Sequence, residues 1–120
     1  MRDATRGGVA AVLHEWAESS GMTLMVQESN LPVSPDVRGA CELLGLDPLH
    51  VANEGTMLVA VANGKGEETA ALLRAISGNN EASVIGKAMS SQSHPVVVQR
   101  VLGVEQPLDD PLGTPLPRIC

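Results

Sequence analysis

The sequence predicts an α+β domain, a layered αβ sandwich in which helices pack on a mixed β-sheet. Three segments with helical spacing of apolar residues alternate with runs of strand-favouring residues, in the order αβαβαββ. The chain has 120 residues, of which 43% are apolar, so it is long enough for one core and small for two. Alternating helices and strands around one core are typical of such layered folds.

Two helices and one strand are predicted in the first part of the chain. Apolar residues recur at helical spacing over residues 8–19, and TLMVQE at 23–28 has the composition of a strand. A second helix is predicted over 35–44, because Ser34 is a suitable N-cap before a proline and Gly45 is a suitable stop.

The central part of the chain is predicted to hold one buried strand, one helix and two further strands. MLVAVA, residues 57–62, is an apolar run without polar alternation, which favours a central strand covered on both faces. Residues 66–77 have apolar side chains on one helical face. Two more strands are predicted near 83–89 and 96–102.

The end of the chain differs in composition, because half of its eight prolines lie in the last 14 residues. Such a segment cannot continue a helix or a central strand and tends to be extended. We therefore expect a folded domain over residues 1–104 and a flexible arm over 105–120, able to span up to ~50 Å. The arm ends on Cys120, which is either a covalent carrier or an inert exposed thiol.

Composition and charge exclude several classes of function. The net charge is −6, and no run of Lys or Arg is present, which disfavours binding to nucleic acid or to an anionic membrane surface. No apolar stretch approaches the roughly 20 residues of a membrane span, and the first residues do not resemble a signal peptide. With only Cys41 and Cys120, a disulfide framework is not expected, and a reducing cytoplasm is the predicted location.

The stretch RDATRGG, residues 2–8, is a candidate anion site at the start of the first helix. Thr5 and Arg6, with the backbone amides of Gly7 and Gly8, offer hydrogen-bond donors and positive charge to a phosphate. The stretch matches neither a P-loop nor a Rossmann fingerprint. Read alone, it is also consistent with an ordinary turn before a helix.

Glu54, in the stretch NEG, is a candidate general base if its carboxylate is partly desolvated. Its ordinary alternative is a loop acid beside a turn glycine. Cys41 lies on the apolar face of its predicted helix and is expected in the core. The three histidines are scattered without the spacing of metal ligands, so no metal site is expected.

Three stretches together, MRDATRGGVAAVLHEWA, CELLGLDPLHVANEGTMLVAV and the terminal LPRIC, resemble the HypE family of hydrogenase maturation proteins. That family belongs with aminoimidazole ribonucleotide synthetase and selenophosphate synthetase. The resemblance implies a PurM-like carboxy-terminal domain. The resemblance also implies that this chain lacks the amino-terminal ATP-binding domain, which forms the dimer in this family. A folded but inactive carboxy-terminal fragment is therefore expected, with no cofactor of its own and a homodimer only when that domain is present.

The resemblance also implies a reaction. HypF would transfer a carbamoyl group to the sulfur of Cys120, and ATP with Mg²⁺ would drive its dehydration to a thiocyanate. The cyanide would pass to iron on a HypC–HypD complex and become a ligand of the [NiFe] hydrogenase centre. Glu54 would remove a proton, and the segment Thr5, Arg6, Gly7 and Gly8 would face the ATP phosphates.

Two other interpretations stay open. The chain could be a non-catalytic module that binds an anion or docks a partner protein. It could also belong to another synthetase of the superfamily, although the terminal PRIC argues against this, because those enzymes need no carboxy-terminal thiol.

Overall fold

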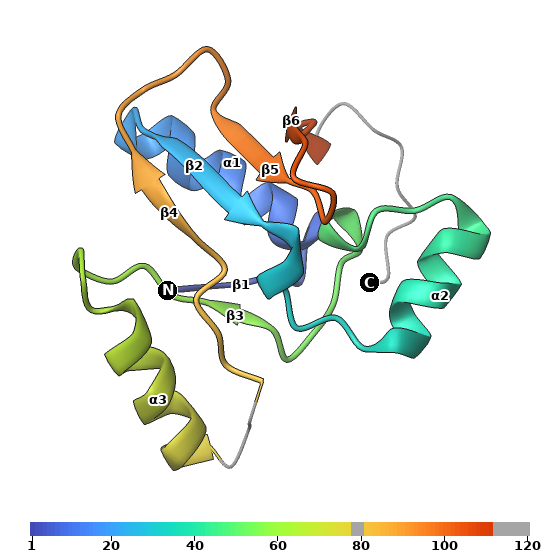
Figure 1. Ribbon diagram of the computed structural model, residues 1–120, viewed down its shortest axis with the longest axis horizontal. Coiled ribbons are helices and arrows are strands. Elements are labelled where there is room, and N and C mark those ends of the chain that lie inside the picture. The colour runs from blue at the N-terminus through green and yellow to red at the C-terminus, as the bar shows by residue number, and fades with distance from the viewer. Residues whose placement is uncertain (78–80, 112–120) are drawn as a thin grey trace.

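A mixed four-stranded sheet backed by helix α1 forms the centre of the computed structural model, which describes residues 1–77 and 81–111 (Figure 1). The strand order is β4-β2-β5-β6, in which β2 pairs parallel with β5 and antiparallel with β4. A second, two-stranded sheet joins β1 to β3. The predicted α+β class, with helices on a mixed sheet, is confirmed.

The elements follow one another along the chain with these bounds. The helices are α1 (Gly8–Ser20), α2 (Pro35–Leu44) and α3 (Gly66–Ser77), with two short 3₁₀ helices, η1 (Glu28–Asn30) and η2 (Pro48–His50). The strands are β1 (Arg2–Asp3), β2 (Thr23–Gln27), β3 (Met57–Leu58), β4 (Gly86–Met89), β5 (Val96–Gln99) and β6 (Glu105–Pro107). None of the helices in the described part of the chain is long and apolar enough to cross a membrane.

The core lies between α1 and the inner face of the sheet. Val26 of β2 stands beside Val98 of β5 in the parallel register, and both side chains are buried. From α1, Ala10, Leu13 and Ala17 pack into the same cluster. Branched and small aliphatic side chains thus fill a core that has no Phe or Tyr to fill it.

The predicted capping of α2 is confirmed. The Ser34 side chain accepts a hydrogen bond from the backbone N–H of Val37 at 3.4 Å, and Pro35 occupies the first turn. Gly45 ends the helix in the left-handed conformation, with φ 67°. Cys41, at the inner face of this helix, is 6% exposed, as expected for a core residue.

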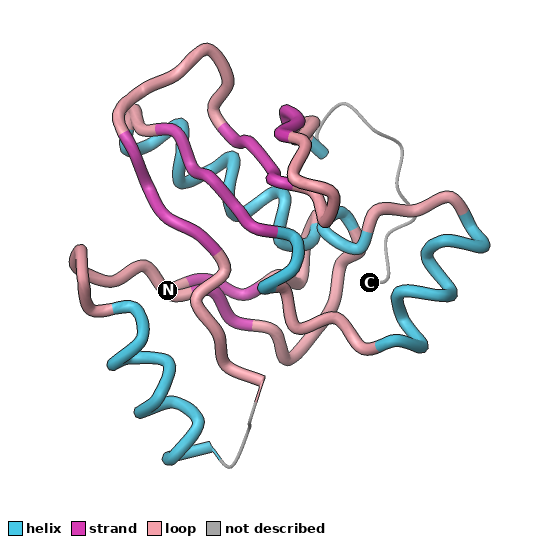
Figure 2. The backbone as a smooth tube through the Cα atoms, in the orientation of Figure 1, coloured by secondary structure: helices cyan, strands magenta, loops and turns pink. Residues whose placement is uncertain are grey.

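The prediction of a buried central strand over residues 57–62 is wrong for this chain. Strand β3 covers only Met57–Leu58 and pairs with β1, while β2 takes the central position in the larger sheet. After Leu58 the chain continues as a loop, in which Val59 is 41% exposed and Val61 is 42% exposed (Figure 2). An apolar run in a sequence indicates burial, but no described segment of this chain buries Val59 and Val61.

The first residues of the predicted arm belong to the folded domain. The chain turns tightly after β5, where the N–H of Arg100 donates to the oxygen of Val104 at 2.8 Å, and it returns as β6. Leu108 is 4% exposed, and its N–H donates to the oxygen of Val96. A boundary at residue 105 is therefore too early. Residues 112–120 lie outside the described residues, and a flexible arm there remains a prediction.

Candidate functional site

The turn Thr5–Gly8 leads into α1 through two consecutive glycines in the left-handed conformation, with φ 70° at Gly7 and 67° at Gly8. The turn packs closely on the segment around η2. A Cβ atom at Gly8 would lie 2.5 Å from the backbone oxygen of Leu49 and 2.8 Å from that of Val51. No side chain fits in that space, so glycine is required for the turn to approach this segment.

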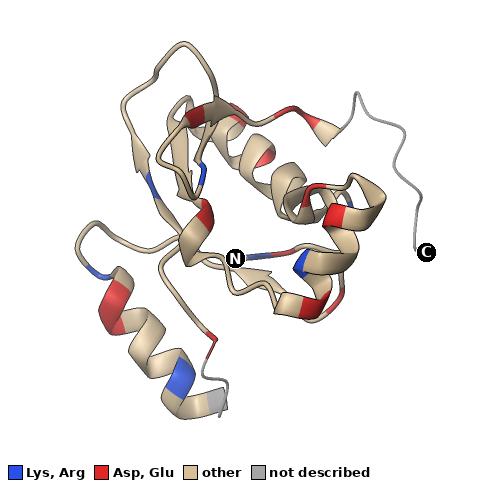
Figure 3. Ribbon diagram, turned by 45° about the vertical axis from the view of Figure 1, so that its right-hand side comes forward, with Lys and Arg blue, Asp and Glu red and all other residues tan. Residues whose placement is uncertain are grey.

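The electrostatics of this turn favour an anion. The first turn of α1 contains no acidic residue, so the positive end of the helix is not neutralised from within. The side chain of Arg6 is exposed beside it, whereas Arg2 is held in an ion pair with Glu15 at 3.1 Å. Elsewhere, the acidic residues are spread over several helices and loops (Figure 3).

The turn that carries Glu54 is held next to the Thr5–Gly8 turn by the backbone of Ala4. The N–H of Asn53 donates to the oxygen of Ala4 at 3.1 Å, and the N–H of Ala4 donates to the oxygen of Thr56 at 3.2 Å. Residues on both sides of Glu54 are thus tied to the residue directly before Thr5. Glu54 itself is exposed. The structure therefore brings together two candidate sites that lie about fifty residues apart in the sequence.

Two histidines hold the chain where it leaves β6. The Nε2 atom of His14, on α1, is 2.9 Å from the backbone oxygen of Leu108, and the Nε2 atom of His50 is 3.0 Å from that of Asp109. Because a carbonyl oxygen can only accept a hydrogen bond, Nε2 is the donor in both rings. Successive residues at the base of the C-terminal segment are therefore fixed from two different elements.

Pro111, the last described residue, lies against the glycine turn. A Cβ atom at Gly7 would lie 3.5 Å from the Pro111 side chain. The candidate carrier Cys120 lies outside the described residues and follows Pro111 by nine positions. Nine extended residues span at most ~30 Å. A thiol tethered at Pro111 therefore has the Thr5–Gly8 turn within its reach.

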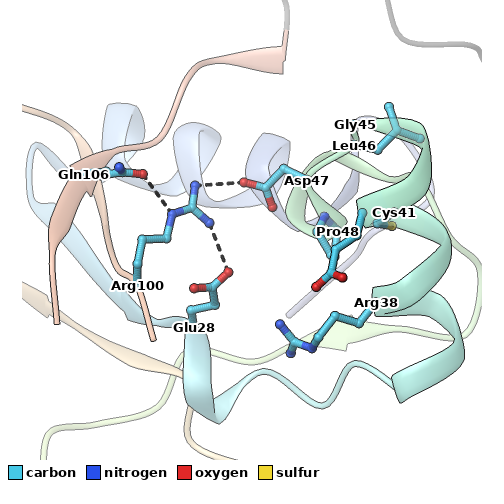
Figure 4. Close-up of a pocket in the computed structure, with 10 residues that line it drawn as sticks. Glu28, Arg38, Cys41, Gly45, Leu46, Asp47, Pro48, Arg100 and Gln106 are labelled. Atoms are coloured by element: carbon cyan, nitrogen blue, oxygen red, sulfur yellow. Dashed lines mark hydrogen bonds and ion pairs between the residues drawn. The ribbon is translucent and has the colours of Figure 1, made fainter. Parts of the chain in front are cut away.

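An ionic cluster that the sequence did not indicate lies on the other side of η2 (Figure 4). Arg100 is 2.9 Å from the carboxylate of Asp47 and 3.3 Å from that of Glu28, and it donates to the Gln106 side chain at 3.1 Å. Burial of the guanidinium acts to lower its pKa, but the hydrogen bonds and negative charge of Asp47 and Glu28 outweigh burial. The pKa of Arg100 is therefore raised above its ordinary value.

The cluster borders an open cavity of about 380 Å³ between α2 and the β5–β6 turn, which Arg38 and Cys41 also line. None of the lining residues belongs to the Thr5–Gly8 turn or to the turn of Glu54. Both carboxylates are paired with Arg100, so the cluster joins β5 to η1 and η2. Within residues 1–77 and 81–111, no group of His, Cys, Asp and Glu could hold a metal ion.

Comparisons with known proteins show which family and which solved folds this chain resembles. The family described as AIR synthase related protein, C-terminal domain, matches residues 1–99. The chain is 45% identical to carbamoyl dehydratase HypE of Escherichia coli (strain K12) over all 120 residues, which cover 35% of that protein. It is 40% identical to the HypE of Rhodobacter capsulatus over 119 residues, again 35% of the relative. The chain thus spans about a third of the length of these relatives.

Solved structures of HypE proteins have the same fold. A crystal structure of HypE in complex with ATP superposes with a TM-score of 0.88 at 37% identity, covering 99% of this chain and 37% of that one. The HypE of E. coli gives a TM-score of 0.83 at 43% identity, covering 99% of this chain and 36% of the other. A crystal structure of a HypE–HypF complex gives 0.82 at 35% identity, covering 90% of this chain and 35% of that one.

Proposed function

Because this chain belongs to the AIR synthase related protein family and matches its C-terminal domain, with HypE relatives along its whole length, we propose that it forms the C-terminal part of a carbamoyl dehydratase for hydrogenase maturation. Its role in that enzyme is to carry the reacting group on the thiol of Cys120 and to present it to the site beside Thr5–Gly8.

One observation carries this proposal: three separate segments meet at the start of α1. The Thr5–Gly8 turn lies next to the turn of Glu54 and also next to Pro111. These three segments come from three different parts of the chain. A carrier thiol must be tethered within reach of the groups that act on it, because tethering raises its effective concentration there.

The reaction proposed for the whole protein is the dehydration of a thiocarboxamide. HypF transfers a carbamoyl group to the sulfur of Cys120, forming S–C(=O)–NH₂. ATP with Mg²⁺ supplies the phosphoryl group that makes the amide oxygen a leaving group. The carbon–oxygen bond then breaks, phosphate departs with the oxygen, and the nitrogen loses both protons, one to Glu54 and one to solvent, to leave S–C≡N. The cyanide is next delivered to iron on a HypC–HypD complex as a ligand for [NiFe] hydrogenase.

The residues of this chain have distinct parts in that scheme. The phosphates are bound by the Thr5 hydroxyl, the Arg6 guanidinium and the amides of Gly7 and Gly8. This assignment agrees with the positive end of α1, whose first turn contains no acidic residue. Glu54 accepts a proton from the amide nitrogen. The known complex of a HypE relative with ATP supports nucleotide binding in the whole protein.

A second candidate role is docking of the carbamoyl donor. The similarity to the HypE–HypF complex covers 90% of this chain, so the chain contains the fold on which such docking would depend. This role is compatible with the first one. Both are compatible with the expectation of a cytoplasmic protein that dimerises only when an amino-terminal domain is present.

The proposal is tested in a full-length chimera in which this chain replaces the matching 120 residues of the E. coli relative. Incubation with HypF and its carbamoyl donor should place the adduct on Cys120, as measured by mass spectrometry of peptides. Cys120→Ala should abolish it. The matched variant Cys41→Ala should still form the adduct on Cys120, because the Cys41 thiol is only 6% exposed. It should lose about 1 kcal/mol of stability or more, because the substitution leaves a small cavity. A folded chimera without an adduct on Cys120 would rule out the proposal.

A further inference from the structure

Helix α3 presents an apolar face that the described part of this chain does not cover. Ala70 faces the body and is 5% exposed, whereas Leu72 is 56% exposed and Ile76 is 82% exposed, one helical turn apart on a neighbouring stripe. No other described element packs extensively against α3. An isolated helix of 12 residues is marginal in water, so an apolar face of this kind indicates a missing partner.

The segment that leads to α3 is also apolar and exposed. Val59 and Val61 follow β3 in an apolar run, and both side chains are more than two fifths exposed. Past Leu58 the run pairs with no other described strand. In Figure 1, α3 lies beyond the end of β3 and below the start of the chain. We call Val59, Val61, Leu72 and Ile76 the α3 surface.

The position of β1 argues for one occupant of the α3 surface. Arg2 pairs with Leu58, so the residues before β1 in a longer relative arrive at the edge from which the α3 surface begins. The family match is to a C-terminal domain, and this chain covers only 35% of the first relative, so about two thirds of that relative's length lies outside the match. A second copy of this chain fits less well, because each copy carries a net charge of −6.

We propose that the α3 surface is the docking surface for the remaining, N-terminal part of a HypE-type polypeptide. Docking would cover the apolar stripe of α3 and give the Val59–Val61 run a neighbour on its open edge. A large apolar contact would also hold the two parts of the enzyme in a fixed relation. This inference rests on the family membership and the exposed side chains, and it does not depend on the chemistry proposed for Cys120.

Amide hydrogen exchange tests the proposal in the full-length chimera and in the 120-residue chain. Amides 70–76 of α3 should exchange at least about tenfold more slowly in the chimera. The double variant Leu72→Ser/Ile76→Ser should remove most of that protection. Leu43→Ser is the matched control, because that leucine is 90% exposed on α2 and lies outside the α3 surface. Equal exchange of α3 in the chimera and in the chain would overturn the proposal.

A second measurement needs only the 120-residue chain. If the α3 surface is uncovered there, Leu72→Ser/Ile76→Ser should leave the melting temperature within about 2 °C of the parent. A larger drop would show that the chain covers the surface itself. Protection of α3 that rises with protein concentration would assign the surface to a second copy. Either result would contradict docking of the N-terminal part, whatever happens at Cys120.

Discussion

His50 donates a hydrogen bond from Nε2 to the backbone oxygen of Asp109 across 3.0 Å, joining segments fifty-nine residues apart. His50 is also the last residue of η2, the segment against which Gly8 packs. One short element therefore supports the glycine turn on one side and fixes the exit of the C-terminal segment on the other. This shared support places Pro111, the last described residue, beside the Thr5–Gly8 turn.

Loss of the His50 ring should loosen this support measurably. We expect His50→Ala to lower the free energy of unfolding by about 0.5–1.5 kcal/mol, the usual net value of one hydrogen bond. Urea unfolding of the 120-residue chain measures it. His94→Ala is the control, because that residue is exposed and, within residues 1–77 and 81–111, only its backbone oxygen forms a hydrogen bond, with the hydroxyl of Thr23. It should change stability by less than about 0.5 kcal/mol. Equal effects of the two substitutions would contradict an anchoring role.

Two glycines with the same backbone conformation separate close packing from backbone strain. Gly8 has φ 67° and Gly21 has φ 68°. Of these two, only Gly8 is crowded, because a Cβ atom added there would lie 2.5 Å from the nearest backbone atom. At Gly21 nothing lies within 4 Å. Gly21→Ala should therefore cost about 1–2 kcal/mol, the penalty of a left-handed alanine.

Gly8→Ala should cost about 3 kcal/mol or more, because the turn must also move away from Leu49 and Val51. Denaturant midpoints of the two variants give the difference. Similar losses at both positions would mean that the Thr5–Gly8 turn is not held against η2, and the geometry of the candidate site would then be wrong.

The helices were predictable because their signals are local. Periodic apolar residues and glycine stops gave 8–19, 35–44 and 66–77, each within one residue of the helix that forms. A helix satisfies its own backbone hydrogen bonds, so its limits depend on nearby residues. The Ser34 cap is an example, because its partner is three residues away.

The strands were less predictable because pairing is decided by distant residues. The 57–62 run is apolar enough for a central strand, but β2 holds that position and the run is left exposed. The opposite error occurred after residue 104, where the prolines indicated that no strand would form although β6 does. Pro107 is nevertheless accommodated, because β6 lies at the edge of the sheet, where a missing N–H is tolerated.

The candidate site was predicted in part. The residues themselves indicated Thr5–Gly8 and Glu54 as candidates, and the resemblance to the HypE family supplied their expected roles. The structure places the backbones of the two turns next to each other through Ala4. The contacts of His14 and His50 had no local signal, because their partners lie 94 and 59 residues away. The Arg100 cluster was missed for the same reason, since an isolated arginine in a sequence does not show which carboxylates it will meet.

Removal of Arg100 should destabilise the chain, because Glu28 and Asp47 would lose their shared cation while staying about three quarters buried or more. We expect Arg100→Met to cost about 1.5–3 kcal/mol, the usual value of hydrogen bonds to charged groups. Arg38→Met is the control, since that arginine lines the same cavity and forms no ion pair with a residue in the described ranges. Urea unfolding at low salt measures both, and equal losses would contradict a special role for Arg100.

The dependence of this contribution on pH follows from the raised pKa of Arg100. A cation with a raised folded-state pKa stabilises fully below its unfolded pKa, and the stabilisation is lost only as pH rises through the folded value. For an arginine that range is strongly alkaline. The difference between Arg100→Met and the parent should therefore not fall between about pH 7 and 9. A decrease over that range would mean that another group titrates in the cluster.

Glu54→Gln in the full-length chimera should separate the two steps that share Cys120. In the proposed reaction, carbamoylation needs the sulfur and HypF but no base in this domain, whereas dehydration requires the amide nitrogen to lose its protons. Glutamine keeps the shape of glutamate and cannot accept a proton at neutral pH. The variant should accumulate thiocarboxamide and form thiocyanate about 10²–10⁴-fold more slowly. Mass spectrometry distinguishes the adducts, since dehydration removes one water.

Glu18→Gln, which removes an exposed carboxylate from α1, is the matched control and should dehydrate normally. If Glu54→Gln forms thiocyanate at the parental rate, Glu54 is an ordinary turn residue and the base belongs to another part of the enzyme.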